Sequence, residues 1–312
     1  MKVGLDIMGG DFAPEATIKG AILATKSIPE GVILVLIGDK EKIIEIDEFK
    51  DLVSPKVEIV HTSEFIHMGE HPAKAFAKKP DASIVIGFKL LQTGKIDGFL
   101  SAGNTGAMLV GAMQVVKSIP GIIRPCISVA LPKHNNKHTI VLDVGINPDS
   151  KPDVLYQYAI LGSLYAEYIY NTHSPKVGLL NIGKEEEKGN LLTKTTYQAM
   201  KDTADFNFIG NVEGNDIFNE KVDVIVCDGF VGNVILKQVE AFYDLIKKRE
   251  SYDEFFEKYN YVDYGGSPIL GINAPVVIGH GISNDMAIKN MIINTINVIK
   301  ANLVDKFKEA FK

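Results

Sequence analysis

Residues 97–113 read DGFLSAGNTGAMLVGAM: a short apolar strand, a loop of glycines and small polar side chains, and an apolar helix. The loop SAGNTG holds two glycines and three short polar residues, which suit a turn better than a strand or a helix interior. Because glycine has no side chain, the backbone N–H groups of such a turn approach a ligand closely. The stretch therefore predicts a strand–loop–helix unit with a candidate ligand loop at its centre.

The same order of strand, glycine- or asparagine-bearing loop and helix occurs six times along the chain. Besides residues 101–106, the loops are MGGDFAPE at 8–15, GINPDSKP at 145–152, GKEEEKGN at 183–190, DGFVGN at 228–233 and GHGISN at 279–284. Strands that alternate with helices form a largely parallel sheet with helices on both faces. The sequence therefore predicts an α/β protein with a three-layer, Rossmann-like fold.

All six loops are expected at one edge of that sheet. They follow the carboxyl ends of their strands, which is where open α/β sheets bind ligands. Helix N-termini present free N–H groups and the positive end of the helix dipole there, and this setting suits an anion such as phosphate. One such loop alone is more simply a tight turn. Six on one edge favour a site that holds phosphate through backbone amides.

Composition limits the class of protein. The 312 residues carry a net charge of −6, whereas general nucleic-acid binders carry a basic face. Cys126 and Cys227 lie far apart and form no disulfide framework, which is typical of the reducing cytosol. The amino terminus shows no signal-peptide core, and no apolar run reaches the roughly 18 residues of a membrane span. We expect a cytoplasmic protein with at most loose attachment to a membrane.

One charged, tyrosine-rich segment breaks the composition and predicts a helical excursion at residues 238–266 within a single domain of residues 1–312. Its apolar residues recur at helical spacing; they are Tyr252, Phe255, Phe256 and Tyr259. Acidic residues interleave with them and oppose binding to an anionic membrane. We interpret the stripe as a packing face, against a partner subunit or the chain's own core, with weak or absent membrane contact.

Three further motifs give weak signals. The HMGEH segment at 67–71 has the spacing of a zinc site, but Gly69 and the following Pro72 oppose the helix that such a site needs. GHGISN lacks the third glycine of a dinucleotide loop, and no P-loop motif occurs. Buried cysteine usually acts as a small hydrophobe, so both cysteines are interpreted as structural. We expect neither a metal nor a cofactor.

Seven segments, in order, resemble the motifs of the bacterial phosphate acyltransferases of phospholipid synthesis, the PlsX type. They are DIMGGDFAP, SAGNTGAM, LDVGINPDSKP, GLLNIGKEEEKGN, FIGNVEGND, VCDGFVGNVILK and the closing HG. The resemblance implies transfer of a fatty acyl group from acyl carrier protein to inorganic phosphate, which yields acyl phosphate. It also implies a homodimer, no metal or nucleotide requirement, and a fold like that of isopropylmalate dehydrogenases and phosphotransacetylases.

Candidate site residues follow from the loops and from this resemblance. Lys188, which matches the lysine of the family's E-x-K-G stretch, is expected to stabilise the developing negative charge. Asn233 is expected to position phosphate or the carbonyl, and His280 to donate a hydrogen bond or act as general acid. The expected substrate-binding residues are Gly9, Gly10, Asp11, Ser101, Gly103, Asn104, Thr105, Gly106, Asn147, Gly232 and Lys237.

Carboxylates and cations near the loops have separate expected roles. Asp6, Asp11 and Asp143 are expected to shape the loops by accepting backbone N–H bonds. Lys184 stands where the family commonly has threonine and adds a cation near the site. Acyl carrier protein is strongly acidic, so docking requires a local basic patch on this chain. The candidate clusters are Lys74, Lys78 and Lys79, and Lys247, Lys248 and Arg249.

Two other functions remain open from the sequence. A hydroxy-acid dehydrogenase of the same fold would use NAD and need a divalent metal with grouped aspartates. A non-catalytic protein that binds phosphate or acyl carrier protein would keep the same loops and turn nothing over. An assay for phosphate-dependent release of thiol and acyl phosphate from acylated carrier protein distinguishes the acyltransferase from both.

Overall fold

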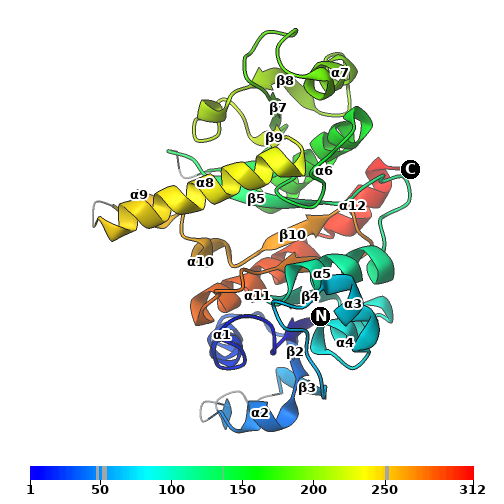
Figure 1. Ribbon diagram of the computed structural model, residues 1–312, viewed down its shortest axis with the longest axis vertical. Helices are drawn as coiled ribbons and strands as arrows, with labels where there is room; N and C mark the ends of the chain where they lie inside the picture. The colour runs from blue at the N-terminus through cyan, green and yellow to red at the C-terminus, as the bar shows by residue number, and fades with distance from the viewer. Residues whose placement is uncertain (47–48, 51–54, 136, 250–252) are drawn as a thin grey trace. The chain divides into compact units, whose positions relative to one another are not determined.

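The computed structural model describes residues 1–312 except 47–48, 51–54, 136 and 250–252 (Figure 1). The chain forms two compact units. Unit 1 is Met1–Lys117 with Tyr261–Lys300, and unit 2 is Ser118–Asn260 with Ala301–Lys312. In each unit, strands alternate with helices and most strand pairs are parallel. The predicted α/β fold class is confirmed.

The sheet of unit 1 has the strand order β3-β2-β1-β4-β11-β10. Neighbouring strands run parallel, except that β10 and β11 pair antiparallel. The elements of unit 1 are β1 (Lys2–Asp6), α1 (Glu15–Thr25), β2 (Ile33–Gly38), α2 (Lys40–Ile44), β3 (Val57–His61), α3 (Pro72–Lys78), α4 (Ser83–Gln92), β4 (Gly98–Ser101), α5 (Thr105–Gly111), the π-helical turn η2 (Ala112–Val116), α10 (Tyr261–Tyr264), β10 (Ser267–Leu270), β11 (Val276–Ile278) and α11 (Asp285–Lys300).

Helices cover both faces of this sheet, because successive strand side chains point to opposite sides. On one face Leu5 of β1 belongs to a buried apolar cluster with Ile18 of α1 and Ile292 of α11. On the other face Phe99 of β4 packs against Phe88 of α4, with ring centroids 5.1 Å apart. Each such buried side chain contributes roughly 1.5–3 kcal/mol relative to an exposed one. The layers of unit 1 are those that the sequence predicts.

The sheet of unit 2 has the strand order β5-β6-β9-β7-β8, with only the β5–β6 pair antiparallel among the described residues. Helix α8 begins directly after β9 and is the long yellow helix of Figure 1. The elements of unit 2 are β5 (Cys126–Pro132), β6 (His138–Leu142), α6 (Pro152–Tyr170), β7 (Lys176–Leu180), α7 (Leu191–Met200), β8 (Asn207–Val212), the 3₁₀ turn η3 (Gly214–Asp216), β9 (Val224–Val226), α8 (Gly229–Lys248), α9 (Glu254–Glu257) and α12 (Leu303–Ala310).

The sheet orders gather the predicted loops into two clusters. In unit 1, β1, β4 and β11 are parallel neighbours, so the loops that follow their carboxyl ends lie side by side. In unit 2, β6, β9 and β7 are parallel neighbours, and the same holds for the loops that follow them. Each unit therefore carries a candidate ligand edge of its own, described separately below.

Candidate active site

The loops after β1 and β11 are joined by a backbone hydrogen bond in unit 1. The N–H of Asp11 donates to the carbonyl of Gly281 at 2.7 Å. Gly10 adopts φ +115°, a conformation that side-chain-bearing residues rarely take, and a Cβ there would lie 3.2 Å from the same carbonyl. The glycine at this position is thus required both by the backbone conformation and by the close approach of the β11 loop.

The loops after β1 and β4 are joined by buried polar side chains. Ser101 Oγ donates to Asp6 Oδ2 at 2.6 Å and accepts the N–H of Gly103 at 2.9 Å. Asp6 Oδ1 accepts the N–H of Met8 at 3.0 Å. Burial raises the pKa of Asp6, although the hydrogen bonds from Ser101 and from the N–H of Met8 oppose the rise. Ser101 is 0% exposed, so its hydroxyl shapes the loop.

Asn104 is a buried anchor at the start of α5. Its Oδ1 accepts the N–H of Ala107 at 2.9 Å and caps the helix, as asparagine commonly does. Its Nδ2 donates to the carbonyls of His67, Met68 and Glu70 at 3.0–3.1 Å. The side-chain amide is therefore occupied by the HMGEH segment. The sequence did not reveal these bonds, because the partners lie 34–37 residues away.

The HMGEH segment, residues 67–71, forms a loop directly before α3. Glu70 accepts the N–H of His67 at 2.8 Å and pairs with Lys79 at 2.6 Å. Helix α3 begins only after it, at Pro72, in line with the expectation that proline opposes a zinc-type helix here. Within the described part of the chain, no group of three His, Cys, Asp or Glu side chains is arranged to hold a metal ion.

Thr105 and His280 are the more accessible members of the unit 1 cluster. Thr105 is the first residue of α5 and is exposed, so its hydroxyl lies beside the free N–H groups of the helix N-terminus. Gly106 packs against Pro72, with no room for a Cβ. His280 is half-buried, and its ring centroid lies 5.2 Å from that of Tyr261. The start of α5 and His280 thus follow neighbouring parallel strands, β4 and β11, at this edge.

Asp143 organises the unit 2 cluster. Its carboxylate is 0% exposed and accepts the N–H groups of Ile127, Gly145, Ile146 and Asn147 at 2.7–3.2 Å. A carboxylate with so many backbone donors fixes the path of the chain after β6. The expectation that Asp143 shapes its loop is confirmed.

Asn147 is likewise held inside its loop. Its Nδ2 donates to the carbonyl of Pro125 and to the hydroxyl of Tyr158, each at 2.7 Å, and to Asp143 Oδ2 at 3.1 Å. The residue is 7% exposed. Its backbone is also occupied, because its N–H donates to Asp143 and its carbonyl accepts the N–H of Gly229 at 2.8 Å. Asn147 therefore stabilises the loop, and the expected substrate contact is not seen at its side-chain nitrogen or its backbone.

The first turn of α8 packs closely against the loop after β6. A Cβ on Gly232 would overlap the carbonyl oxygen of Asp143, so glycine is required there. Asn233 Nδ2 donates to the carbonyl of Val144 at 3.2 Å, and the residue remains exposed. Asp228 caps the helix by accepting the N–H groups of Phe230 and Val231 at 2.9–3.0 Å. Asn233 thus lies at the start of the second turn of α8 and contacts the loop after β6.

The predicted lysines differ in their surroundings. Lys188 is exposed in the loop after β7, and its carbonyl accepts Nδ2 of Asn181 at 3.1 Å. Lys237, one helical turn beyond Asn233, is 56% exposed and pairs with Glu240 at 2.7 Å. Lys184 is 51% exposed and lies 3.7 Å from two carboxylates, those of Glu213 and Asp216. Among these residues, Lys188 has the environment best suited to meeting an incoming anion.

Aromatic residues of the excursion pack within unit 2. Phe255 stacks on His134 with centroids 5.1 Å apart, and the hydroxyl of Tyr259 donates to the carbonyl of Pro132 at 3.0 Å. Phe255 and Phe256 also contact Tyr259. Tyr252, the remaining residue of the predicted stripe, lies outside the described residues. The described aromatics thus contact one another and the segment around Pro132 and His134 of unit 2. No helix in the described ranges has the length and apolar character to cross a bilayer.

Comparisons with solved structures relate the fold to two kinds of enzyme. A branched-chain phosphotransacylase from Enterococcus faecalis V583 superposes with a TM-score of 0.66 at 14% identity, over 96% of this chain and 99% of that one. A 4-hydroxythreonine-4-phosphate dehydrogenase from Klebsiella pneumoniae gives a TM-score of 0.57 at 12% identity, with coverage of 96% and 99%. At such identities the likeness shows the fold alone.

Sequence comparison is more specific. A family model described as "Fatty acid synthesis protein" matches residues 1–249. The phosphate acyltransferase of Dictyoglomus turgidum is 42% identical over 328 residues, which cover 99% of this chain and 97% of the relative. The motifs at the strand ends, the phosphotransacylase-like fold and this end-to-end match agree, and the chain belongs to the phosphate acyltransferase family.

Proposed function

We propose that this protein transfers a fatty acyl group from the thioester of acyl carrier protein to inorganic phosphate, giving acyl phosphate for phospholipid synthesis. The observation that carries the proposal is the pair of strand-end loop clusters in a chain of the phosphate acyltransferase family. The exposed N-terminus of α5 at Thr105 suits an anion. The protein acts as a cytoplasmic homodimer, and residues 1–312 form one acyltransferase domain with 238–266 as its excursion.

The reaction needs no nucleophile from the protein. A phosphate oxygen attacks the thioester carbonyl carbon, and negative charge moves to the carbonyl oxygen. The tetrahedral species collapses, the carbon–sulfur bond breaks, and the pantetheine thiolate leaves and takes up a proton. Donors that face the carbonyl oxygen lower this barrier; loss of one such donor typically costs about 100- to 1000-fold in rate.

Roles follow from the surroundings of each candidate residue. Thr105 and the N–H groups at the start of α5 bind phosphate, while buried Asn104 and Ser101 hold that loop in shape. Lys188 stabilises the developing negative charge. Asn233 positions the phosphate or the carbonyl, and His280 protonates the leaving thiolate. Gly9 and Gly106 allow close approach of the backbone, since a Cβ at either would clash with neighbouring atoms, and a Cβ on Gly103 would make tight contacts of 3.0–3.2 Å.

The test uses acyl carrier protein loaded with palmitate, with and without phosphate. We expect free thiol and hydroxylamine-trappable acyl phosphate to appear together, in equal amounts, and only with phosphate present. Thiol release without acyl phosphate would instead indicate a thioesterase. Binding of both substrates without turnover would indicate the non-catalytic protein. The dehydrogenase alternative predicts metal-dependent reduction of NAD, which the same preparation checks; only a likeness of fold favours it.

A further inference from the structure

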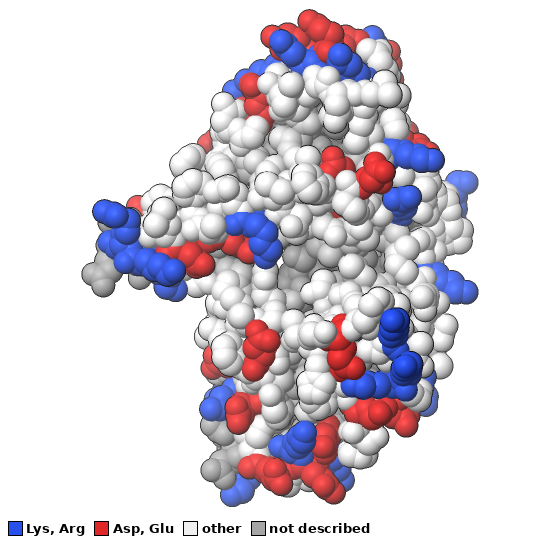
Figure 2. Space-filling model, in the orientation of Figure 1, with Lys and Arg blue, Asp and Glu red and all other residues white. Residues whose placement is uncertain are grey.

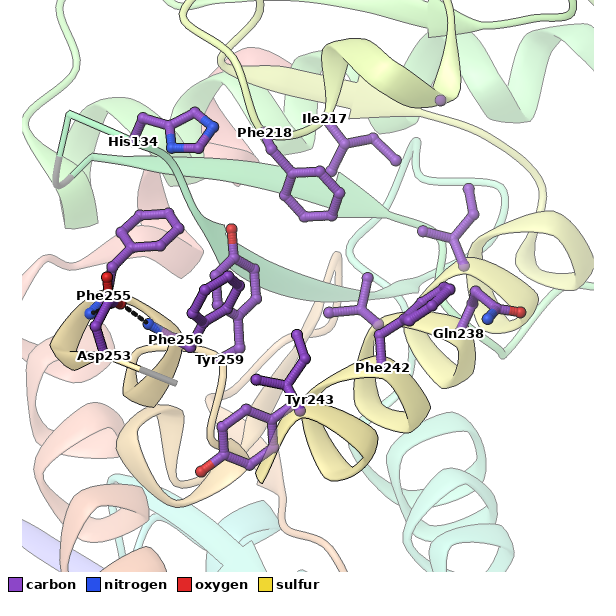
Figure 3. A pocket seen from close by; sticks show the side chains of 14 residues that line it. His134, Ile217, Phe218, Gln238, Phe242, Tyr243, Asp253, Phe255, Phe256 and Tyr259 are labelled. Atoms are coloured by element: carbon purple, nitrogen blue, oxygen red, sulfur yellow. Dashed lines mark hydrogen bonds between the residues drawn. The ribbon is translucent and has the colours of Figure 1, made fainter. Parts of the chain in front are cut away.

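An apolar cavity of about 880 Å³ lies within unit 2, between α8, α9 and the segment after β8 (Figure 3). Its wall on α8 runs from Ile235 through Val239 and Phe242 to Ile246, residues spaced three or four apart and hence on one helix face. Figure 3 shows side chains of Phe218, Phe256 and Tyr259 directed into the same space. The volume is within the roughly 300–1,000 Å³ of small-molecule sites.

The cavity lies along α8, the helix that begins at the candidate catalytic loop. Its first wall residue on α8, Ile235, lies two positions after Asn233. The first two turns of α8 also expose apolar side chains outside the cavity wall: Phe230 is 64% exposed and Val234 is 52% exposed. From Ile235 to Ile246 the helix rises about 16 Å. The wall on α8 therefore begins close to the loop where the carbonyl is proposed to react and extends along the helix axis toward α9.

We propose that this cavity, here called the α8 groove, binds the alkyl chain of the acyl substrate, with the carbonyl end at Asn233 and the methyl end toward Ile246. The inference rests on the proposed function, because the acyl group is the substrate named there. An alkyl chain makes no hydrogen bonds, and the groove walls on α8 are mostly aliphatic and aromatic. Burial of each methylene is favourable, so a longer alkyl chain binds more tightly until it extends past the groove wall at Ile246.

The proposed direction of the alkyl chain predicts how substitutions that fill the groove act at different depths. Val239 lies one helical turn beyond Ile235, whereas Ile246 lies three turns beyond it. Val239→Phe fills the middle of the groove and excludes long and medium chains. Ile246→Phe fills only the far end and excludes the longest chains. Ala241 is exposed on the same helix outside the groove wall, so Ala241→Phe is the matched control.

The experiment measures kcat/KM for acyl phosphate formation from butyryl-, octanoyl-, dodecanoyl- and palmitoyl-acyl carrier protein. For Val239→Phe we expect a loss of about 10- to 200-fold with palmitoyl, as for a mismatch in a hydrophobic pocket, and little change with butyryl. For Ile246→Phe we expect the loss to begin at a longer chain. Ala241→Phe should keep the wild-type profile. Equal loss at all chain lengths, or the same cutoff for both fillers, overturns the proposal.

Photolabelling with a diazirine analogue of palmitate separates failure of this proposal from failure of the proposed function. Labelled peptides from α8 and from residues 253–259, lost in Val239→Phe, support the groove even if the wild type forms no acyl phosphate. Labelling elsewhere, with acyl phosphate formed normally, overturns the groove and leaves the function standing. Light scattering provides a last check. If the fillers convert a dimer to monomers with an unchanged chain-length profile, a second copy covers the groove and the proposal fails.

Discussion

Ser101 Oγ at the end of β4 donates a 2.6 Å hydrogen bond to Oδ2 of Asp6 at the end of β1. The bond joins neighbouring strands below the loops that carry Gly10 and Thr105. Asp6 is 1% exposed, and burial raises its pKa because water no longer solvates the charge. This pair therefore fixes the loop geometry and couples it to pH.

The first prediction concerns the pH dependence of stability. Because the pKa of Asp6 is higher in the folded than in the unfolded chain, folded protein binds more protons between the two values. The contribution of Asp6 to the free energy of unfolding is thus complete below the unfolded pKa of 3.8 and is lost as pH rises through the folded pKa. Urea unfolding of wild type and Asp6→Asn, from about pH 4 to 7, should show wild type losing stability relative to the variant. If the unfolding free energy of wild type stays constant or rises with pH relative to that of Asp6→Asn, this prediction is wrong.

The second prediction separates anchoring from binding in the SAGNTG loop. Asn104→Ala removes the cap of α5 and leaves three carbonyls without their donor, so we expect a loss of about 1–3 kcal/mol in unfolding free energy. Thr105→Ala, next in sequence and exposed, should change stability by less than about 0.5 kcal/mol. It should instead raise the KM for phosphate. Thermal unfolding of both variants tests the anchoring role, and their phosphate kinetics test the binding role. An unchanged melting temperature in Asn104→Ala would refute the anchoring role.

The third prediction tests the catalytic assignment of Lys188. Lys188→Ala removes a cation from the loop after β7, and we expect kcat to fall about 100- to 1000-fold with thermal stability nearly unchanged. Lys194→Ala, an exposed lysine on the following helix α7, is the matched control and should retain full activity. Near-normal turnover in Lys188→Ala would remove the residue from the mechanism.

How far the sequence predicts this molecule depends on the range of the interactions. The order of strands, loops and helices follows local signals, and Asn104 before an apolar helix is itself a cap signal. The roles of Asn104 and Asn147 are less accessible to sequence analysis, because their side chains bond partners up to 37 and 22 residues away. The same is true of the α8 groove. Its walls come from separate segments around Ile217, Val239 and Phe255, and no local sequence pattern predicts that these segments lie together.

The fourth prediction concerns the cysteines. Cys126 and Cys227 are buried, and desolvation raises the pKa of both thiols well above the usual value. The native protein should therefore resist thiol reagents at neutral pH and react with two equivalents only when unfolded. Cys227→Ala should keep acyl phosphate formation, with any loss traced to stability. A stably folded but inactive variant would point to a covalent thiol mechanism instead.

The last prediction locates the docking surface for the acidic carrier. Figure 2 shows lysine and arginine side chains gathered over α3 in unit 1 and at the tip of α8 in unit 2. Lys79 of the α3 cluster is paired with Glu70, but Lys74 and Lys78 are exposed. Pro72, the first residue of α3, packs against Gly106, so this cluster adjoins the proposed phosphate loop. Lys248 lies fifteen residues beyond Asn233, about 22 Å along the helix and farther than the roughly 8 Å over which salt screens charge.

We therefore expect Lys74→Glu/Lys78→Glu to raise the KM for palmitoyl-acyl carrier protein about tenfold and to flatten its dependence on salt, since steering by charge weakens. The kcat should stay unchanged, and so should turnover of a palmitoyl thioester of N-acetylcysteamine, which carries no protein. Lys248→Glu serves as the control and should leave the KM for the carrier within about twofold, because its charge is screened from the loop. If Lys248→Glu raises that KM as much as the double variant, the carrier docks at the tip of α8. If turnover of the carrier substrate and of the N-acetylcysteamine thioester falls equally in the double variant, the α3 cluster stabilises the fold of the site and does not bind the carrier.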